Sequence, residues 1–169
     1  GQYNDSRMGA TIQCYLKGFN DPRTSVYFKN SGSKAVRAGL PVTGKTYDDA
    51  SLSNVTEDTP VYWMKASEVC FLRAEGALAG FAMGGSAQKF YEAGIRTSFE
   101  ECGVSLGSYL SSNNTPVAYQ DPAGSYNYSA PSNITVKWSD AETDERNLER
   151  IITQKYLAIY PDGQEAWSE

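Results

Sequence analysis

The stretch VCFLRAEGALAGFAMGGSAQKFYEAGIRTSFEECG, residues 69–103, decides the fold. It holds two helix-like runs rich in Ala, Gly and aromatic residues, separated by Met83-Gly84-Gly85-Ser86. The Gly-Gly pair breaks the first run, and Ser86 is a favourable N-cap for the second. Small residues along both runs allow two backbones to approach closely. The stretch therefore predicts a tightly packed helical hairpin.

Each arm of this hairpin carries a stripe of apolar and small residues at three- and four-residue steps, which is typical of the packed face of a helix. The first helix is predicted to begin at Val61, and its stripe is Trp63, Ala66, Cys70, Ala74, Ala77 and Phe81. The second stripe is Ala87, Phe90/Tyr91, Gly94/Ile95, Ser98/Phe99 and Cys102.

The rest of the chain alternates shorter helices with long polar segments. Helices are predicted over residues 5–18 and 144–160, and Asn20-Asp21-Pro22-Arg23 is predicted to start another. Residues 29–60 are predicted to form a long ordered loop, and residues 103–139 another in which only Ile134–Trp138 alternates like a strand. The predicted fold class is mainly α: a tetratricopeptide-like hairpin, further helices, long ordered loops and at most a minor β-hairpin.

Composition bounds the class of protein. The 169 residues suit a single domain spanning residues 1–169, and a net charge of −5 excludes the basic surface of a nucleic-acid binder. No apolar run approaches the roughly 18 residues that a membrane span needs. Twelve tyrosines, among 12% aromatic residues, favour surfaces that are half apolar and half wet.

The sequence contains no histidine, which excludes His-based triads and zinc-protease motifs. Cys14, Cys70 and Cys102 are widely spaced and form no zinc pattern, so no metal, cofactor or catalytic residue is predicted. A glycosidase that uses only two carboxylic acids for catalysis would need no histidine, so this class of enzyme is kept as an alternative function. Its acids would come from Asp48-Asp49 or residues 140–145, which are predicted instead to be solvated loops and helix starts. The latter stretch also lacks the glycine that a calcium loop requires, because Glu145 stands there.

The hairpin resembles a tetratricopeptide unit. A single unit cannot bury both of its faces, and three or more are normally needed. Either other helices cover this hairpin or the chain belongs to something larger. A protein-interaction module of tetratricopeptide type, without glycan binding, is therefore an alternative function.

Six blocks of the sequence, in order along residues 5–169, carry a more specific resemblance. They are Gly18-Phe-Asn-Asp-Pro-Arg23, Trp63-Met-Lys-Ala-Ser-Glu68, Phe71-Leu-Arg-Ala-Glu75, Tyr91-Glu-Ala-Gly-Ile-Arg96, Asn147-Leu-Glu-Arg-Ile-Ile-Thr-Gln-Lys155 and Pro161-Asp-Gly-Gln-Glu-Ala-Trp167. Together they resemble the SusD/RagB family of outer-membrane glycan-binding lipoproteins from Bacteroidetes.

The resemblance implies a mainly helical fold and a role in nutrient uptake. Family members are tethered at the cell surface by a lipidated cysteine, partner a TonB-dependent outer-membrane transporter (SusC-like), and capture oligosaccharides or, in some cases, peptides. They are not enzymes. They are also longer, so the chain is expected to be the C-terminal part of such a protein. Cys14, Cys70 and Cys102 do not correspond to the lipid-anchor cysteine.

A glycan platform needs exposed aromatic faces and polar groups that bind hydroxyls. Two loop regions offer both, and the predicted carbohydrate-binding residues are Tyr47, Asp48, Asp49, Tyr119, Tyr126, Asn127 and Tyr128. The alternative is that these tyrosines pack their own loops down. Structural roles are predicted for the conspicuous polar residues of the blocks, which are Asn20, Asp21, Arg23, Glu68, Arg73, Glu75, Gln154, Lys155, Glu165 and Trp167.

Overall fold

The computed structural model describes residues 6–41 and 45–168. The chain divides into two compact units. The first comprises Gly1–Thr59 and Asn114–Asn133, and the second comprises Pro60–Asn113 and Ile134–Glu169. The class is mainly α, as predicted. None of the described helices is both long enough and apolar enough to cross a membrane.

The first unit is built around α1 (Ala10–Gly18), followed by α2 (Thr24–Tyr27) and the short 3-10 helix η1 (Lys29–Gly32). Apolar side chains of α1 and its approach are buried, namely those of Met8, Ile12 and Leu16. The helix ends where the loop after Asn114 crosses it. A Cβ on Gly18 would lie 2.6 Å from the Cα of Pro116, so only glycine fits there.

The turn after α1 is fixed by a buried ion pair. The Arg23 guanidinium donates to Asp21 through Nε (3.0 Å, Oδ1) and Nη2 (2.6 Å, Oδ2), and neither side chain is exposed. Asn20 precedes the pair with a φ of 52°. The predicted structural role of these three residues is confirmed.

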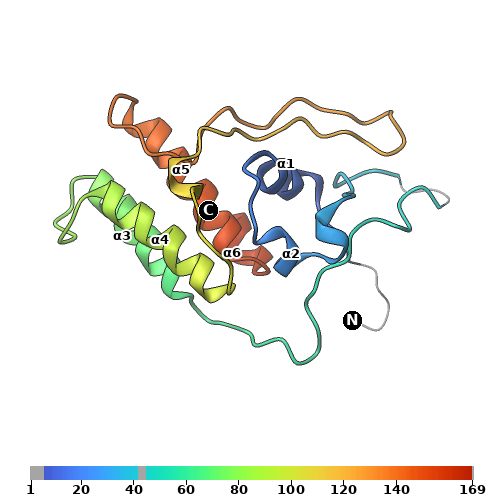
Figure 1. Ribbon diagram of the computed structural model, residues 1–169, viewed down its shortest axis with the longest axis horizontal. Coiled ribbons are helices and arrows are strands. Elements are labelled where there is room, and N and C mark those ends of the chain that lie inside the picture. Colours follow the sequence, from blue (N-terminus) through green and yellow to red (C-terminus); the bar gives the residue numbers. More distant parts are fainter. Residues whose placement is uncertain (1–5, 42–44, 169) are drawn as a thin grey trace. The chain divides into compact units, whose positions relative to one another are not determined.

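Long loops complete the first unit. In residues 6–41 and 45–168 there is no continuous strand, but isolated bridges join Arg7 to Leu52, Gly9 to Val36, Phe28 to Ser53 and Tyr119 to Tyr128. The last of these lies in residues 114–133, which run out and back (Figure 1). The sequence did not indicate where a minor β-hairpin would lie. Long loops are predicted at residues 29–60 and 103–139, and the described residues of both segments are mainly irregular, as predicted. Residues 42–44 of the first segment lie outside the described part of the structure.

The second unit contains the predicted hairpin, with α3 (Ala66–Leu78) and α4 (Ala87–Glu101) side by side (Figure 1). Ser86 caps α4 by accepting a hydrogen bond from the Lys89 amide at 3.2 Å. The centre of the predicted α4 stripe, from Phe90 to Phe99, is buried. At the crossing, a Cβ on Gly94 would lie 2.7 Å from the ring of Phe71, so the glycine permits this close approach.

The predicted start and stripe of the first hairpin helix are wrong. The helix begins at Ala66, and Trp63 before it is 101% exposed. Its buried face is Ser67, Glu68, Phe71 and Ala74, so only Ala74 of the predicted stripe lies on it. The Lys65 amide donates to the Glu68 carboxylate at 3.4 Å, a capping contact that fixes the start after Val61–Met64. The predicted stripe was chosen by continuing the three- and four-residue spacing of apolar residues back to Trp63. Because Trp63 lies outside the helix, this spacing identified the wrong face as buried.

The remaining helices of the second unit are η2 (Tyr109–Ser111), α5 (Asp144–Ala158) and α6 (Gly163–Ser168). Thr143 caps α5 by accepting from the Arg146 amide at 3.3 Å. Both α3 and α4 contact α5. The Lys65 ammonium donates to the carbonyls of Ala158 and Tyr160, at 2.8 Å each, and so joins the start of α3 to the end of α5.

Polar residues of the sequence blocks bind helices together, as predicted for several of them. Lys155, 1% exposed, lies 3.5 Å from Glu75 across α5 and α3. Gln154 donates to the Tyr109 hydroxyl at 3.1 Å. The side chain of Trp167 lies outside the described part of the structure.

Residues Ile134–Trp138 do not form the predicted strand and have irregular structure instead. Their alternation has another cause. Ile134, Val136 and Trp138 are buried, and the Val136 carbonyl accepts a hydrogen bond of 2.6 Å from Tyr91 of α4. The segment thus packs along the hairpin without pairing with another strand.

Candidate functional site

The first unit joins the two predicted loop regions through one carboxylate. The Tyr47 hydroxyl donates to Oδ1 of Asp121 at 2.7 Å. The Tyr119 hydroxyl donates to the Ala35 carbonyl at 2.9 Å and lies 3.5 Å from the same Asp121 oxygen. The loop that carries Tyr47 is therefore tied to the loop of residues 119–128.

Asp121 also shapes its own loop. Its Oδ2 accepts hydrogen bonds from the amides of Ser125 (3.1 Å) and Tyr126 (3.2 Å), and its amide donates to the Asn127 side chain at 2.7 Å. Sequence reasoning missed Asp121. The signal was present, because Asp121-Pro-Ala-Gly124 is a turn pattern and Gly124 has a φ of 77°.

The electrostatics of this cluster follow from the shared carboxylate. Burial disfavours charge on Asp121, but the hydrogen bonds from Tyr47 and from loop amides outweigh it and lower the pKa of Asp121. The hydrogen bond that Tyr47 donates to Asp121, together with burial of the phenol, raises the pKa of Tyr47 to about 12. Burial, followed by the charge of Asp121, raises the pKa of Tyr119 to about 12. The cluster therefore holds one carboxylate and two neutral phenols at neutral pH.

Tyr128 packs the base of the loop. Its ring centroid lies 5.3 Å from that of Tyr119, and the Arg37 guanidinium lies 5.5 Å above its ring. Its hydroxyl is 3.7 Å from Sγ of Cys14. Burial raises the pKa of the Cys14 thiol, so this cysteine is a weak nucleophile.

The predicted carbohydrate-binding residues differ in their exposure. Tyr47 and Tyr119 are only 7% and 1% exposed, so their rings offer no open face and support the loops. Tyr126, at 36% exposure, presents a ring to solvent. Asn127, Asp48 and Asp49 are exposed as well, although Asp49 is paired with Lys34.

Acidification is expected to loosen residues 121–128. Because the folded-state pKa of Asp121 is lowered, its stabilising effect is present at neutral pH and is lost as pH falls through the folded pKa, below the ordinary value of about 3.9. Hydrogen-exchange protection factors of this loop should fall over that range. Asp121→Asn should lower them ~10-fold already at neutral pH.

The matched control for this change is Asp48→Asn, since Asp48 is exposed in the neighbouring loop. It should leave protection of residues 121–128 unchanged. Full protection in the Asp121→Asn variant would contradict the role assigned to this carboxylate.

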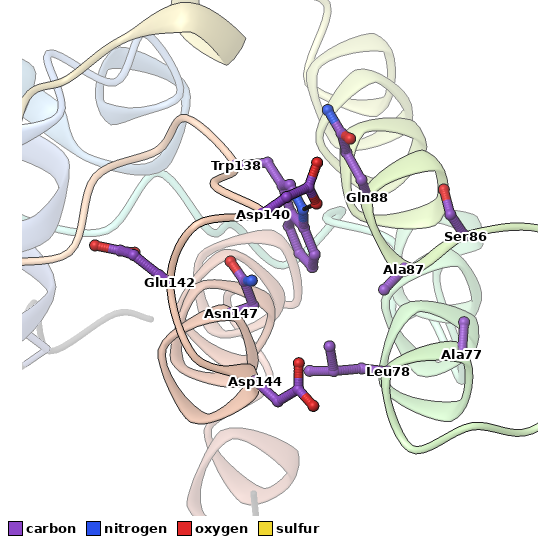
Figure 2. A pocket seen from close by; sticks show the side chains of 10 residues that line it. All are labelled: Ala77, Leu78, Ser86, Ala87, Gln88, Trp138, Asp140, Glu142, Asp144 and Asn147. Atoms are coloured by element: carbon purple, nitrogen blue, oxygen red, sulfur yellow. Dashed lines mark hydrogen bonds between the residues drawn. The ribbon is translucent and has the colours of Figure 1, made fainter.

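The second unit has a cavity of about 340 Å³ at the turn end of the α3–α4 hairpin (Figure 2). The lining residues are Ala77, Leu78, Ser86, Ala87, Gln88, Trp138, Asp140, Glu142, Asp144 and Asn147. None of the predicted carbohydrate-binding residues belongs to this set. Sequence reasoning did not connect the acidic stretch 140–145 with the hairpin turn, because tertiary packing brings them together.

The carboxylates of this cavity are mostly engaged. Asp140 accepts a hydrogen bond of 2.8 Å from the Trp138 indole, and Glu142 is paired with Arg150. In Figure 2 the Glu142 side chain extends away from the hairpin, whereas Asp144 extends toward Leu78. Such a cavity can accept hydrogen bonds from hydroxyls. Two of its three acids are held as structural acceptors, which does not fit the acid pair of a glycosidase.

Comparison with known proteins gives a consistent result. The family model of SusD-like proteins, described as SusD and RagB outer membrane lipoproteins, matches residues 1–169. A solved SusD homologue from Bacteroides thetaiotaomicron is 46% identical, with a TM-score of 0.90 over 96% of this chain and 37% of its own. A chitin-binding SusD homologue from Flavobacterium johnsoniae is 42% identical, with a TM-score of 0.93 over 99% of this chain and 37% of its own.

A third solved structure, a SusD homologue from Bacteroides ovatus, is 38% identical, with a TM-score of 0.86 over 99% of this chain and 38% of its own. Among curated proteins no match is found. The chain thus spans little more than a third of the solved structures that it matches.

Proposed function

Because the chain belongs to the SusD-like family of outer-membrane lipoproteins, we propose that it is the C-terminal part of a longer protein that captures oligosaccharide at the cell surface. That protein delivers its ligand to a TonB-dependent outer-membrane transporter. It binds the glycan without cleaving it, and its membrane attachment is a lipid anchor outside this chain.

The observation that carries the proposal is the likeness to the chitin-binding relative, which is 42% identical and matches 99% of this chain. The arrangement of the first unit supports it. A buried, hydrogen-bonded cluster of Tyr47, Tyr119 and Asp121 joins loops whose exposed residues offer an aromatic face and polar groups. Sugar rings stack on such faces, and their hydroxyls bind carboxylates and amides.

Within the predicted set we assign different roles. Tyr126 stacks on a sugar ring, and Asn127, Asp48 and Asp49 bind hydroxyls, because these residues are exposed. Tyr47, Tyr119 and Tyr128 pack within the first unit and stabilise the loop around Tyr47 and the loop of residues 119–128. The absence of histidine from the sequence and the engaged acids of the second unit support binding in place of catalysis.

Tyr126→Ala is expected to weaken glycan binding ~2- to 10-fold, the contribution of one stacked aromatic ring. The measurement is isothermal titration of the longer protein with soluble chito-oligosaccharides first, followed by an array of other glycans and peptides. Intact ligand should be recovered after incubation.

Tyr62→Ala is the matched control, since Tyr62 is a 60%-exposed tyrosine of the second unit and should leave affinity unchanged. Failure of the longer protein to bind any glycan or peptide would overturn the proposal, and release of shortened sugars would overturn its non-catalytic part. Copurification of a TonB-dependent transporter from outer membranes tests the delivery step.

A further inference from the structure

The cavity of the second unit lies between the turn end of the α3–α4 hairpin and the start of α5 (Figure 2). All of its lining residues belong to the second unit, so a ligand there needs no contact with the first. Its volume of about 340 Å³ is close to the lower limit of small-molecule sites, which is about 300 Å³. The cavity therefore suits a single sugar ring or a single side chain better than a long oligosaccharide.

The two sides of this cavity differ in chemistry. Ala77, Leu78 and Ala87 give the hairpin side an apolar surface. Asp140, from the segment before α5, and Asp144, from its first turn, give the other side carboxylates. In Figure 2 the Asp144 side chain extends toward Leu78. A ligand that places carbon atoms against one side and a polar group against the other would use both.

The lining of the cavity carries negative charge that is not balanced locally. Among the described residues, none of those that line the cavity is lysine or arginine. Glu142 is paired with Arg150, but Asp140 and Asp144 have no ion-pair partner in residues 6–41 and 45–168. The N-terminus of α5 contributes only about half a positive charge. The cavity therefore favours a cation.

The core of the second unit holds Asp140 in place. Its Oδ1 accepts a hydrogen bond of 2.8 Å from the indole of Trp138, which is 8% exposed. The Trp138 ring packs against that of Tyr91, with 5.3 Å between the ring centroids. The second oxygen of Asp140, Oδ2, has no hydrogen-bond donor in the part of the chain that the structure describes. A carboxylate that is already positioned loses little conformational entropy when a ligand binds to it.

We propose that this cavity binds a primary ammonium group carried on a small carbon skeleton. Asp144 and Oδ2 of Asp140 supply the acceptors, and the skeleton packs against Leu78 and Ala87. An ammonium group has three donors and no acceptor, which matches a lining whose charged groups are all acceptors. Two sources offer this chemistry, an amino sugar and a lysine side chain. The inference does not rest on the proposed function, which assigns glycan binding to the first unit.

Other ligands fit this lining less well. The carboxylates would repel an anion. A metal ion needs several ligands at short distance, and the described residues include no group of three or more that could hold one. A neutral sugar could donate hydroxyl hydrogen bonds to the same acceptors, but it would leave both negative charges without compensation.

Titration of the full-length gene product, made with isotope-labelled tryptophan, tests the inference by nuclear magnetic resonance. The indole N–H signal of Trp138, identified by its loss in Trp138→Phe, should shift with glucosamine and with Nα-acetyl-lysine amide at a mildly acidic pH that protonates both amines. N-acetylglucosamine, whose nitrogen is an uncharged amide, is the matched probe and should leave the signal in place. A response to only one of the two amines would identify its source as the ligand.

Two variants locate the site. Asp144→Asn should weaken amine binding ~10-fold, because one charged acceptor is lost. Asp140→Asn should do the same, although its side-chain oxygen can still accept from the Trp138 indole. Glu145→Gln removes an exposed acid that does not line the cavity, and it should leave the affinity unchanged.

The controls separate this site from charge attraction in general. Equal responses to glucosamine and N-acetylglucosamine, no response to either amine, or full affinity in both aspartate variants would overturn the inference. So would an equal loss of affinity in Glu145→Gln, since the amine would then be attracted by net charge alone. Failure of the longer protein to bind any glycan or peptide through the first unit, with the Trp138 response retained, would overturn only the proposed function.

Discussion

Replacing Arg23 by Ala is expected to destabilise the first unit by ~3–5 kcal/mol, because it removes the guanidinium that balances the charge of the buried Asp21 carboxylate. Neither side chain of this pair is exposed, and two hydrogen bonds join them in addition to their charges. A whole domain is typically stable by only ~5–15 kcal/mol. The variant should therefore lose a large share of its stability, and α1 and the turn after it should open more often.

Hydrogen exchange resolved by peptide is the appropriate measurement, since two compact units need not unfold together. Protection should fall across α1 and α2 and persist in the α3–α4 hairpin. Arg96→Ala removes an exposed arginine and should change stability by less than ~0.5 kcal/mol. If the Arg23→Ala variant matched this control, the pair would be no more important than a surface ion pair.

Phe71→Ala is expected to cost ~3–5 kcal/mol in the second unit, since a fully buried ring would be removed from the hairpin crossing. Phe71 is 0% exposed and lies directly over Gly94. Gly94→Ala is informative in its own right. Alanine favours a helix over glycine by ~1 kcal/mol, but here its methyl would lie 2.7 Å from the Phe71 ring.

The two changes should be coupled. In the double variant the methyl group of Ala at position 94 enters space that the ring has left, so the combined cost should be smaller than the sum of the single costs. Denaturant unfolding of the four proteins gives the coupling energy. Phe81→Ala, which removes a 69%-exposed ring, serves as the control. Strict additivity would show that Gly94 and Phe71 do not constrain each other.

Sequence patterns predicted helices whose ends are determined locally. Ser86 and the acidic residues at the start of α5 are capping signals that act within one turn, and both helices begin where these signals place them. The start of α3 was missed because an apolar period continues through Trp63, while the capping contact of Glu68 sets the start at Ala66. Local spacing does not reveal which side of a helix the fold will bury when apolar residues occur on more than one of its faces, as they do on α3.

The same limit applies to the candidate site. Tyrosine-rich loops could be recognised in the sequence, but the exposure of each ring depends on contacts between distant residues. Tyr47 and Asp121, which are hydrogen-bonded in the structure, are 74 positions apart. The Asp-Pro-Ala-Gly turn identifies a bend, yet nothing local reveals that its carboxylate also accepts from Tyr47. The sequence therefore predicted the fold class, but it did not predict which tyrosines are exposed and which are buried in support of the loops.

The interleaved order of the two units has a consequence for synthesis on the ribosome. The chain leaves the first unit at Thr59, returns at Asn114 and leaves again after Asn133. Asp121, which binds Tyr47, thus emerges only after the whole α3–α4 hairpin has been made. Local helical contacts form quickly, whereas contacts between distant segments form slowly. The nascent first unit must therefore wait for its last segment, with part of its core open to chaperones and proteases in the meantime.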